Sequence, residues 1–301
     1  MDDQGRTSQL FGAGPLGDRV TPMRDSISAI QLEPKTIVAD YLVRQVKIRR
    51  LVEHIVGSRL FDAWFRVSPA IKEMICLGKV EGLVEERTWW RKEPVWDLVI
   101  FDAPATGHGL GLLRLPEQAA KLLIGPMRTN ALSVQGLLTN QKTTGLLIVT
   151  IPEDMPVNEA VHFHDEARAH TSVPLSGVVL NAAAPARFDA ASAAALPAAL
   201  AGAPLGPLAG ALFGDPAVEP GAGAATSEVL ARAAAWSQVR AETTARYRDE
   251  LRARIPDLPL VEVPFVFAEQ FATTELEQVA LLLERGLTAA GLLAPAQGGA
   301  A

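Results

Sequence analysis

The residue with the clearest potential for chemistry is Asp102, which directly follows the short apolar run 97–101 (DLVIF). A run of this length, rich in β-branched and aromatic residues, predicts a buried parallel strand. The next residues, 103–109 (APATGHG), favour neither a strand nor a helix. Open α/β sheets bind ligands at the carboxyl ends of such strands, and in phosphate-handling sheets a carboxylate there holds Mg²⁺ through water. The alternative is that Asp102 only caps the following loop.

The segment 101–117 (FDAPATGHGLGLLRLPE) resembles the ArsA family of anion-transporting ATPases, which includes arsenite-pump-type and tail-anchored-protein-targeting ATPases. The resemblance rests on Thr106, Gly107 and His108, followed by the 115–117 (LPE) stretch at the family's offset. It implies that Thr106, Gly107 and His108 line the second switch region. It also implies that Asp102 is a catalytic residue that holds Mg²⁺ through water.

Two later segments agree with the same family pattern. Pro152 and Glu153 follow the apolar run 144–150 and open a helix, and Asn181 follows the apolar run 175–180. The resemblance implies that these three residues belong to the nucleotide site. Asn181 would recognise adenine, because an amide offers the base both a donor and an acceptor. The alternative for Asn181 is an ordinary residue of a turn at a strand end.

The resemblance assigns two further positions. Pro264 and Phe265 occupy the place of the family's adenine-flanking loop. The segment 1–6 (MDDQGR) resembles a remnant of the first switch loop, with Asp3 at the position of the catalytic Asp thought to orient the attacking water. A frayed acidic terminus is the alternative for Asp3. The cofactors implied for an intact family member are Mg²⁺ and ATP.

The sequence holds no G-x-x-x-x-G-K-[ST] pattern, whose backbone amides, Lys and Ser/Thr hold phosphates and Mg²⁺. In the family, that loop lies between the first strand and a helix, and we therefore expect Val99 and Ile100 to face a gap. Without the loop, Asp102 alone should give negligible turnover. We favour an N-terminally truncated ATPase chain. A catalytically inactive pseudo-ATPase subunit and a non-enzymatic protein-binding module, each paired with an intact homologue, are the alternatives.

The expected strands alternate with helices, which predicts an α/β fold. The family resemblance implies a doubly wound, mostly parallel sheet of the P-loop NTPase type, with the first strands missing and a helical subdomain. The strands are expected at 97–101, 145–150, 175–180 and 259–263. The expected domains are a loop remnant at 1–34, a nucleotide-binding domain at 35–291 with a helical insertion at about 107–140 and an Ala/Gly/Pro-rich insertion at 182–226, and a frayed tail at 292–301.

Helical apolar spacing predicts a helix over 35–66, with a basic cluster, residues 44–50 (RQVKIRR), lying mostly outside its apolar stripe. Such a cluster is typical of a solvated face. Further helices are expected from Pro69, over 110–124 and over 126–138. Pro22 and neighbouring glycines indicate loop in the first 34 residues, with a short strand within 27–32.

Composition limits the compartment and the partners. The formal net charge of −6 argues against a nucleic-acid surface, and no apolar window is long enough for a membrane span. The single cysteine, Cys76, excludes an internal disulfide and a multi-cysteine zinc site, so we expect no zinc and a cytoplasmic protein. The resemblance implies a homodimer or a paired intact ArsA-like subunit, with a membrane or client protein as a further partner. Met127 is the only methionine within 110–138, which argues against a methionine-rich groove for client helices.

Overall fold

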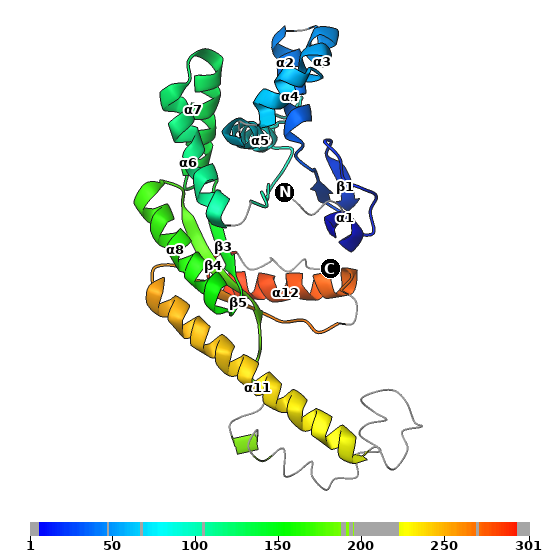
Figure 1. The fold of residues 1–301 in the computed structure, drawn as a ribbon, viewed down its shortest axis with the longest axis vertical. Helices are drawn as coiled ribbons and strands as arrows, with labels where there is room; N and C mark the ends of the chain where they lie inside the picture. The colour runs from blue at the N-terminus through cyan, green and yellow to red at the C-terminus, as the bar shows by residue number, and fades with distance from the viewer. Residues whose placement is uncertain are drawn as a thin grey trace. The chain divides into compact units, whose positions relative to one another are not determined.

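The computed structural model describes residues 6–46, 48–66, 69–103, 106–187, 191–192, 195, 223–268 and 271–293. Its elements (Figure 1) are, in chain order, α1 (Arg6–Leu10), β1 (Thr21–Arg24), β2 (Ile27–Ala29), α2 (Pro34–Val46), α3 (Arg49–Val56), α4 (Arg59–Arg66), α5 (Pro69–Val84), α6 (Thr106–Leu122), α7 (Gly125–Thr139), β3 (Leu146–Thr150), α8 (Asp154–His170), β4 (Leu175–Ala183), α11 (Gly223–Arg254), β5 (Leu260–Pro264) and α12 (Thr273–Ala289).

The chain divides into two compact units, which we treat separately. The first contains Met1–Leu147, His162–Ser176 and Ala268–Glu277. The second contains Ile148–Val161, Gly177–Phe267 and Gln278–Ala301.

The core of the first unit lies between α5, α6 and α7, which pack against one another. Each helix contributes one buried side chain to a shared cluster: Leu77 from α5, Leu112 from α6 and Val134 from α7. Met74 and Phe101 pack against this cluster as partly buried residues. The two helices predicted over 110–138 are therefore confirmed as α6 and α7, because their apolar stripes meet in one core.

The long helix predicted over 35–66 forms as three shorter helices, α2, α3 and α4. The second break falls at Gly57 and Ser58, where α3 ends and α4 begins. The backbone N–H of Phe61 donates to Ser58 Oγ at 3.2 Å, so the Ser58 side chain caps the new helix. Apolar spacing continues across this break, which is why periodicity alone did not reveal it.

The strand predicted at 97–101 is wrong. This run forms no strand, and Leu98 and Ile100 are 76% and 83% exposed. A strand needs a neighbour to complete its hydrogen-bond ladder, and no other described segment pairs with this run. The short strand expected within 27–32 does form as β2, which pairs antiparallel with β1.

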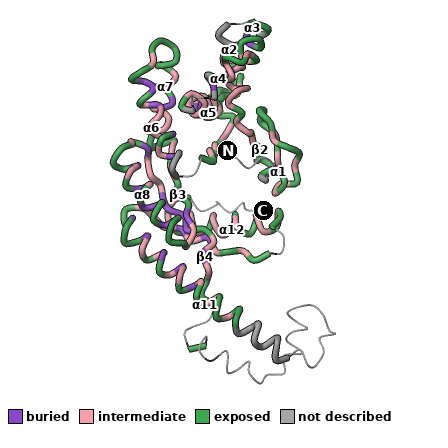
Figure 2. The backbone as a smooth tube through the Cα atoms, viewed as in Figure 1, coloured by how far each residue is buried: buried purple, intermediate pink, exposed green. Residues whose placement is uncertain are grey.

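The second unit is built on the sheet, whose strand order is β3-β4-β5. β4 and β5 run parallel, with Val178 opposite Leu260 and Val179 opposite Val261. Figure 2 shows buried residues gathered on β4, where residues 177–180 are all buried. A central parallel strand is covered on both faces, which explains its uninterrupted apolar run.

Helix α12 packs on this sheet in the second unit. Val179, Val261 and Val263 form a buried cluster, and Val279 and Leu283 pack against it. In the same unit, a side chain at Gly286 would clash with Val261, so glycine allows this close approach. The predicted α/β class is confirmed, and the strands expected at 145–150, 175–180 and 259–263 are present as β3, β4 and β5.

Candidate functional site

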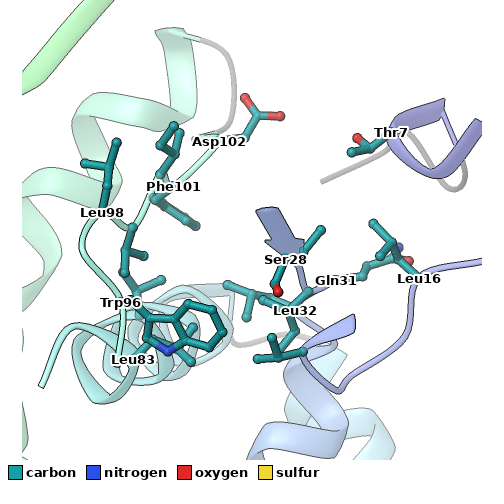
Figure 3. A pocket seen from close by; sticks show the side chains of 16 residues that line it. Thr7, Leu16, Ser28, Gln31, Leu32, Leu83, Trp96, Leu98, Phe101 and Asp102 are labelled. Carbon is teal, nitrogen blue, oxygen red and sulfur yellow. The ribbon is translucent and has the colours of Figure 1, made fainter. Parts of the chain in front are cut away.

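Asp102 lies at a cavity of about 350 Å³ within the first unit. The cavity is bounded by residues 96–102 on one side and by residues 28–32 on the other (Figure 3). Most lining side chains are apolar; besides Asp102, the polar ones include Thr7, Ser28 and Gln31. Val99 and Ile100 are among the lining residues, so the apolar run does face unfilled space.

The Asp102 side chain is exposed, and it makes no hydrogen bond or ion pair within the described part of the chain. Its carboxylate is therefore available to a ligand. The backbone of Thr106, Gly107 and His108 forms the first turn of α6, but their side chains lie outside the described residues. Asp3 also lies outside the described residues.

The residues around Asp102 suit a metal ion that is held through water, and not one bound directly by several protein ligands. In the part of the chain that the structure describes, no group of three or more His, Cys, Asp or Glu side chains converges as metal ligands. A direct protein cage is thus not formed there. Magnesium commonly keeps several waters and uses one or two carboxylates together with substrate phosphates. A single exposed carboxylate suits that mode.

A second group of predicted site residues lies where β4 and β5 end, in the second unit. The pairing of the two strands shifts between Leu180 and Ala183. Ala182 within this bulge has a φ of 56°, a left-handed conformation that few non-glycine residues adopt. Asn181 is exposed at this bulge, although it follows four buried residues. The structure therefore places Asn181 within β4, two residues before the strand ends, and turns its side chain outward.

Backbone contacts bring Pro264 and Phe265 to the same place. Ala183 is paired with Pro264, and the N–H of Phe265 donates to the Ala183 carbonyl at 2.9 Å. The chain beyond the bulge is held by α11, because the N–H of Ala184 donates to Thr244 Oγ1 at 3.1 Å. Asn181 and Pro264–Phe265 thus share the carboxyl edge of two parallel strands, where open α/β sheets bind ligands.

The sequence reasoning missed an aromatic and arginine cluster beside this edge. The Phe265 and Phe267 rings meet edge to face with centroids 4.7 Å apart. The Arg240 guanidinium lies 5.0 Å from the Phe265 ring centroid and 4.8 Å from that of Trp236, and Arg187 lies 5.0 Å from that of Phe267. The two phenylalanines at alternate positions just after β5, Phe265 and Phe267, were the sequence feature that could have indicated this cluster. Arg240 and Trp236 come from α11, and their sequence positions gave no such signal.

Pro152 and Glu153 follow β3 in the second unit and lead into α8. The Glu153 carbonyl accepts the N–H of Val157 at 3.1 Å, and the Glu153 side chain is exposed. The predicted site residues therefore fall into two sets. Asp102 and residues 106–108 belong to the first unit, whereas Asn181, Pro264, Phe265, Pro152 and Glu153 belong to the second.

The chain is similar to known ATPases over part of its length. Residues 11–132 match the family model described as anion-transporting ATPase. The ATPase BagA of Mycobacterium tuberculosis is 28% identical over 124 residues, which cover 41% of this chain and 36% of that protein. The ATPase GET3C of Arabidopsis thaliana is 26% identical over 160 residues, which cover 42% of this chain and 40% of that protein. The matches thus span well under half the length of these relatives.

The family match contains Asp102, the loop after it and all of α6. These residues carried the first part of the sequence resemblance, whereas Pro152, Glu153 and Asn181 lie outside the matched range. Over residues 11–132 the chain is therefore similar to the anion-transporting ATPase family, ArsA, and the expected resemblance is confirmed for that segment.

Proposed function

We propose that this chain contributes the magnesium-binding carboxylate and the adenine contacts of an ArsA-type ATPase. The observation that carries the proposal is the family match over residues 11–132, which includes Asp102 and the Thr106–His108 turn. An exposed carboxylate without a protein partner among the described residues supports a role in binding an ion and its water shell.

The adenine half of the proposal rests on the edge formed by β4 and β5. Asn181 offers an amide donor and acceptor, and Phe265 offers a partly exposed aromatic face nearby. The strained bulge at Ala182 supports a functional reason for this geometry, because such conformations persist where the surroundings hold them and they concentrate at ligand sites. Pro152 and Glu153 are proposed to line the same nucleotide site.

The phosphate-binding groups in this proposal come from outside residues 1–301, since these residues hold no G-x-x-x-x-G-K-[ST] pattern. Two sources are open: a further segment of the same polypeptide, or an intact ArsA-type homologue that pairs with this chain. In either assembly Mg²⁺ would neutralise phosphate charge during hydrolysis, and Asp102 would hold one of its water ligands in place.

Hydrolysis assays on two carboxylate variants test this proposal. In an assembly that includes the phosphate-binding segment, Asp102→Asn should lower the turnover number on the order of 10²-fold or more, with a smaller change in ATP affinity. Asp97→Asn is the matched control, because Asp97 is an exposed carboxylate five positions earlier in the same segment. Equal turnover in the two variants would contradict the magnesium role. Residues 1–301 alone should bind MgATP weakly or not at all, which titration calorimetry measures.

Base choice is tested separately from turnover. Asn181→Ala in the same assembly should narrow the preference for ATP over GTP, because it removes contacts worth roughly 1–3 kcal/mol. The measurement is the ratio of kcat/KM values for the two nucleotides. An unchanged ratio would mean that Asn181 is a structural residue of the bulge.

A second candidate function is a non-catalytic, partner-binding subunit. The observation that favours it is the apolar run 97–101, whose Leu98 and Ile100 are largely exposed beside the cavity. Exposed apolar residues of this size are typical of surfaces that another chain covers. An assembly that pairs with an intact homologue and retains its full ATPase rate when Asp102 is changed to Asn would support this candidate.

A further inference from the structure

Four exposed apolar side chains lie on or directly beside the short helices α3 and α4 in the first unit. Leu51 and Ile55 are 45% and 42% exposed on α3, while Ile48 just before it is 55% exposed. Leu51 and Ile55 are four positions apart, which places them on one side of α3, and Ile48 is the N-cap residue of that helix, with extended backbone. Leu60, near the start of α4, is 82% exposed. We name these four residues the α3–α4 patch.

The α3–α4 patch is not the face that holds α3 in place. Val52, one position after Leu51, is buried, and it lies about a quarter-turn further round the helix. Phe65 is a buried residue of α4 and stacks on Phe61 with ring centroids 5.4 Å apart. The helices therefore keep an apolar inner face and present a second apolar surface outward.

Positive charge is concentrated around the α3–α4 patch. Residues 44–60 include five arginines and lysines and a single acidic residue, Glu53, although the whole chain has a formal net charge of −6. Arg50 and Arg59 are exposed on α3 and α4. The nearby carboxylate of Asp62 is paired with Lys35 at 2.6 Å, which offsets its negative charge.

Exposed apolar side chains with exposed basic residues close by in the sequence, on short amphipathic helices, match one kind of surface well. Such helices lie in the plane of an anionic membrane, with their apolar residues inserted at the boundary between headgroups and acyl chains. Basic side chains meet the phospholipid headgroups, and each adds about fivefold to binding of a strongly anionic surface. A nucleic acid would match the charge, but it would leave the four apolar side chains in water.

We propose that the α3–α4 patch docks this chain onto an anionic phospholipid bilayer. Leu51, Ile55 and Leu60 insert at the interface, and Arg50 and Arg59 contact the headgroups. This is peripheral binding: among the residues that the structure describes, no helix has the length and apolar character needed to cross a membrane. The proposal is independent of nucleotide binding, because none of its residues belongs to the site proposed above.

Vesicle co-sedimentation with residues 1–301 tests the charge requirement. The protein should bind vesicles that contain about one-third phosphatidylserine, and not pure phosphatidylcholine, at about 0.1 M salt, where charges act over about 10 Å. Arg50→Glu with Arg59→Glu should lower the partition coefficient on the order of 10²-fold. Arg19→Glu with Arg91→Glu is the matched control, because it makes the same charge change at exposed positions elsewhere. Control samples without vesicles correct for protein that sediments because it self-associates.

Insertion of the apolar residues is tested by a fluorescent label at Leu51→Cys. The native cysteine, Cys76, is buried, and burial raises the pKa of its thiol to about 11, so it should remain unlabelled at neutral pH. An environment-sensitive dye at position 51 should shift its emission to the blue on anionic vesicles. The same dye at Leu281→Cys, a position outside the patch where the leucine is 54% exposed, should not shift.

Three results would overturn the proposal. Equal binding to neutral and anionic vesicles would remove the role of the arginines. If the protein sediments with the vesicles but the emission of the dye at position 51 does not shift, the membrane contact lies elsewhere. Binding to RNA or an acidic polypeptide, with no vesicle binding, would assign the basic cluster to another macromolecule. Circular dichroism of each variant confirms that the helices are retained, and the exposed positions of the substitutions favour that outcome.

Discussion

Thr244→Val should loosen the connection between α11 and the end of β4. Thr244 is 3% exposed, and its Oγ1 accepts the N–H of Ala184 at 3.1 Å, directly after the bulge that carries Asn181. Valine has nearly the same shape and helix propensity, so the loss is confined to this hydrogen bond. Leaving a buried N–H unpaired costs about 1–3 kcal/mol. Because Ala184 is only half-buried, we expect the lower end, about 1 kcal/mol.

Urea unfolding of Thr243→Val provides the comparison for this prediction. Thr243 is the preceding residue of α11, and its hydroxyl makes no hydrogen bond within the described part of the chain. Its substitution should change the free energy of unfolding by less than about 0.5 kcal/mol. Equal losses in the two variants would refute the reasoning, because the hydrogen bond to Ala184 would then contribute nothing specific.

Three further predictions concern the first unit. Leu77→Ala should cost about 2–5 kcal/mol in the free energy of unfolding, whereas Leu122→Ala, at an exposed position, should cost less than about 0.5 kcal/mol; chemical denaturation compares them. Burial raises the pKa of Glu81 in the folded chain above its ordinary value of 4.5. The contribution of Glu81 to the free energy of unfolding is therefore fully present below pH 4.5, and it is lost as the pH rises through the raised pKa of the folded chain. Glu81→Gln should therefore flatten the dependence of the urea midpoint on pH from 4.5 upward, and an unchanged slope would contradict this. Cys76 should react with a disulfide reagent at pH 8 at least tenfold more slowly in the folded chain than in urea, because its folded pKa is about 11; equal rates would mean that the thiol is accessible.

The sequence predicted the second unit well because its signals are local. The strands predicted at 145–150 and 175–180 are bounded by turn residues, and each coincides with a strand of the observed sheet. The run 97–101 carries the same signal and forms no strand. Apolar composition reports that a segment is suited to a buried strand, but the strand forms only beside a pairing partner, which lies elsewhere in the sequence.

Only part of the candidate site could be predicted, because some of its features depend on contacts between distant segments of the sequence. The family resemblance assigned Asn181 and Pro264 to the nucleotide site, and the strand pairing brings both to one edge of the sheet, whereas their role at that edge stays a prediction. The bulge at Ala182 could not be foreseen, since alanine carries no signal for a positive φ. Arg240 also lacked a signal, because its position over the Phe265 ring depends on how α11 packs.

Photolabelling with 8-azido-ATP tests most directly where the adenine base binds. The label is applied to residues 1–301 at millimolar concentration, because these residues hold no G-x-x-x-x-G-K-[ST] pattern and should bind ATP weakly, and the modified peptides are mapped. We expect labelling of residues 260–267 or 175–184, suppressed by excess ATP and reduced in the Asn181→Ala variant. Labelling that ATP does not suppress, or that maps elsewhere in the chain, would contradict the assignment of an adenine site to the carboxyl edge of β4 and β5.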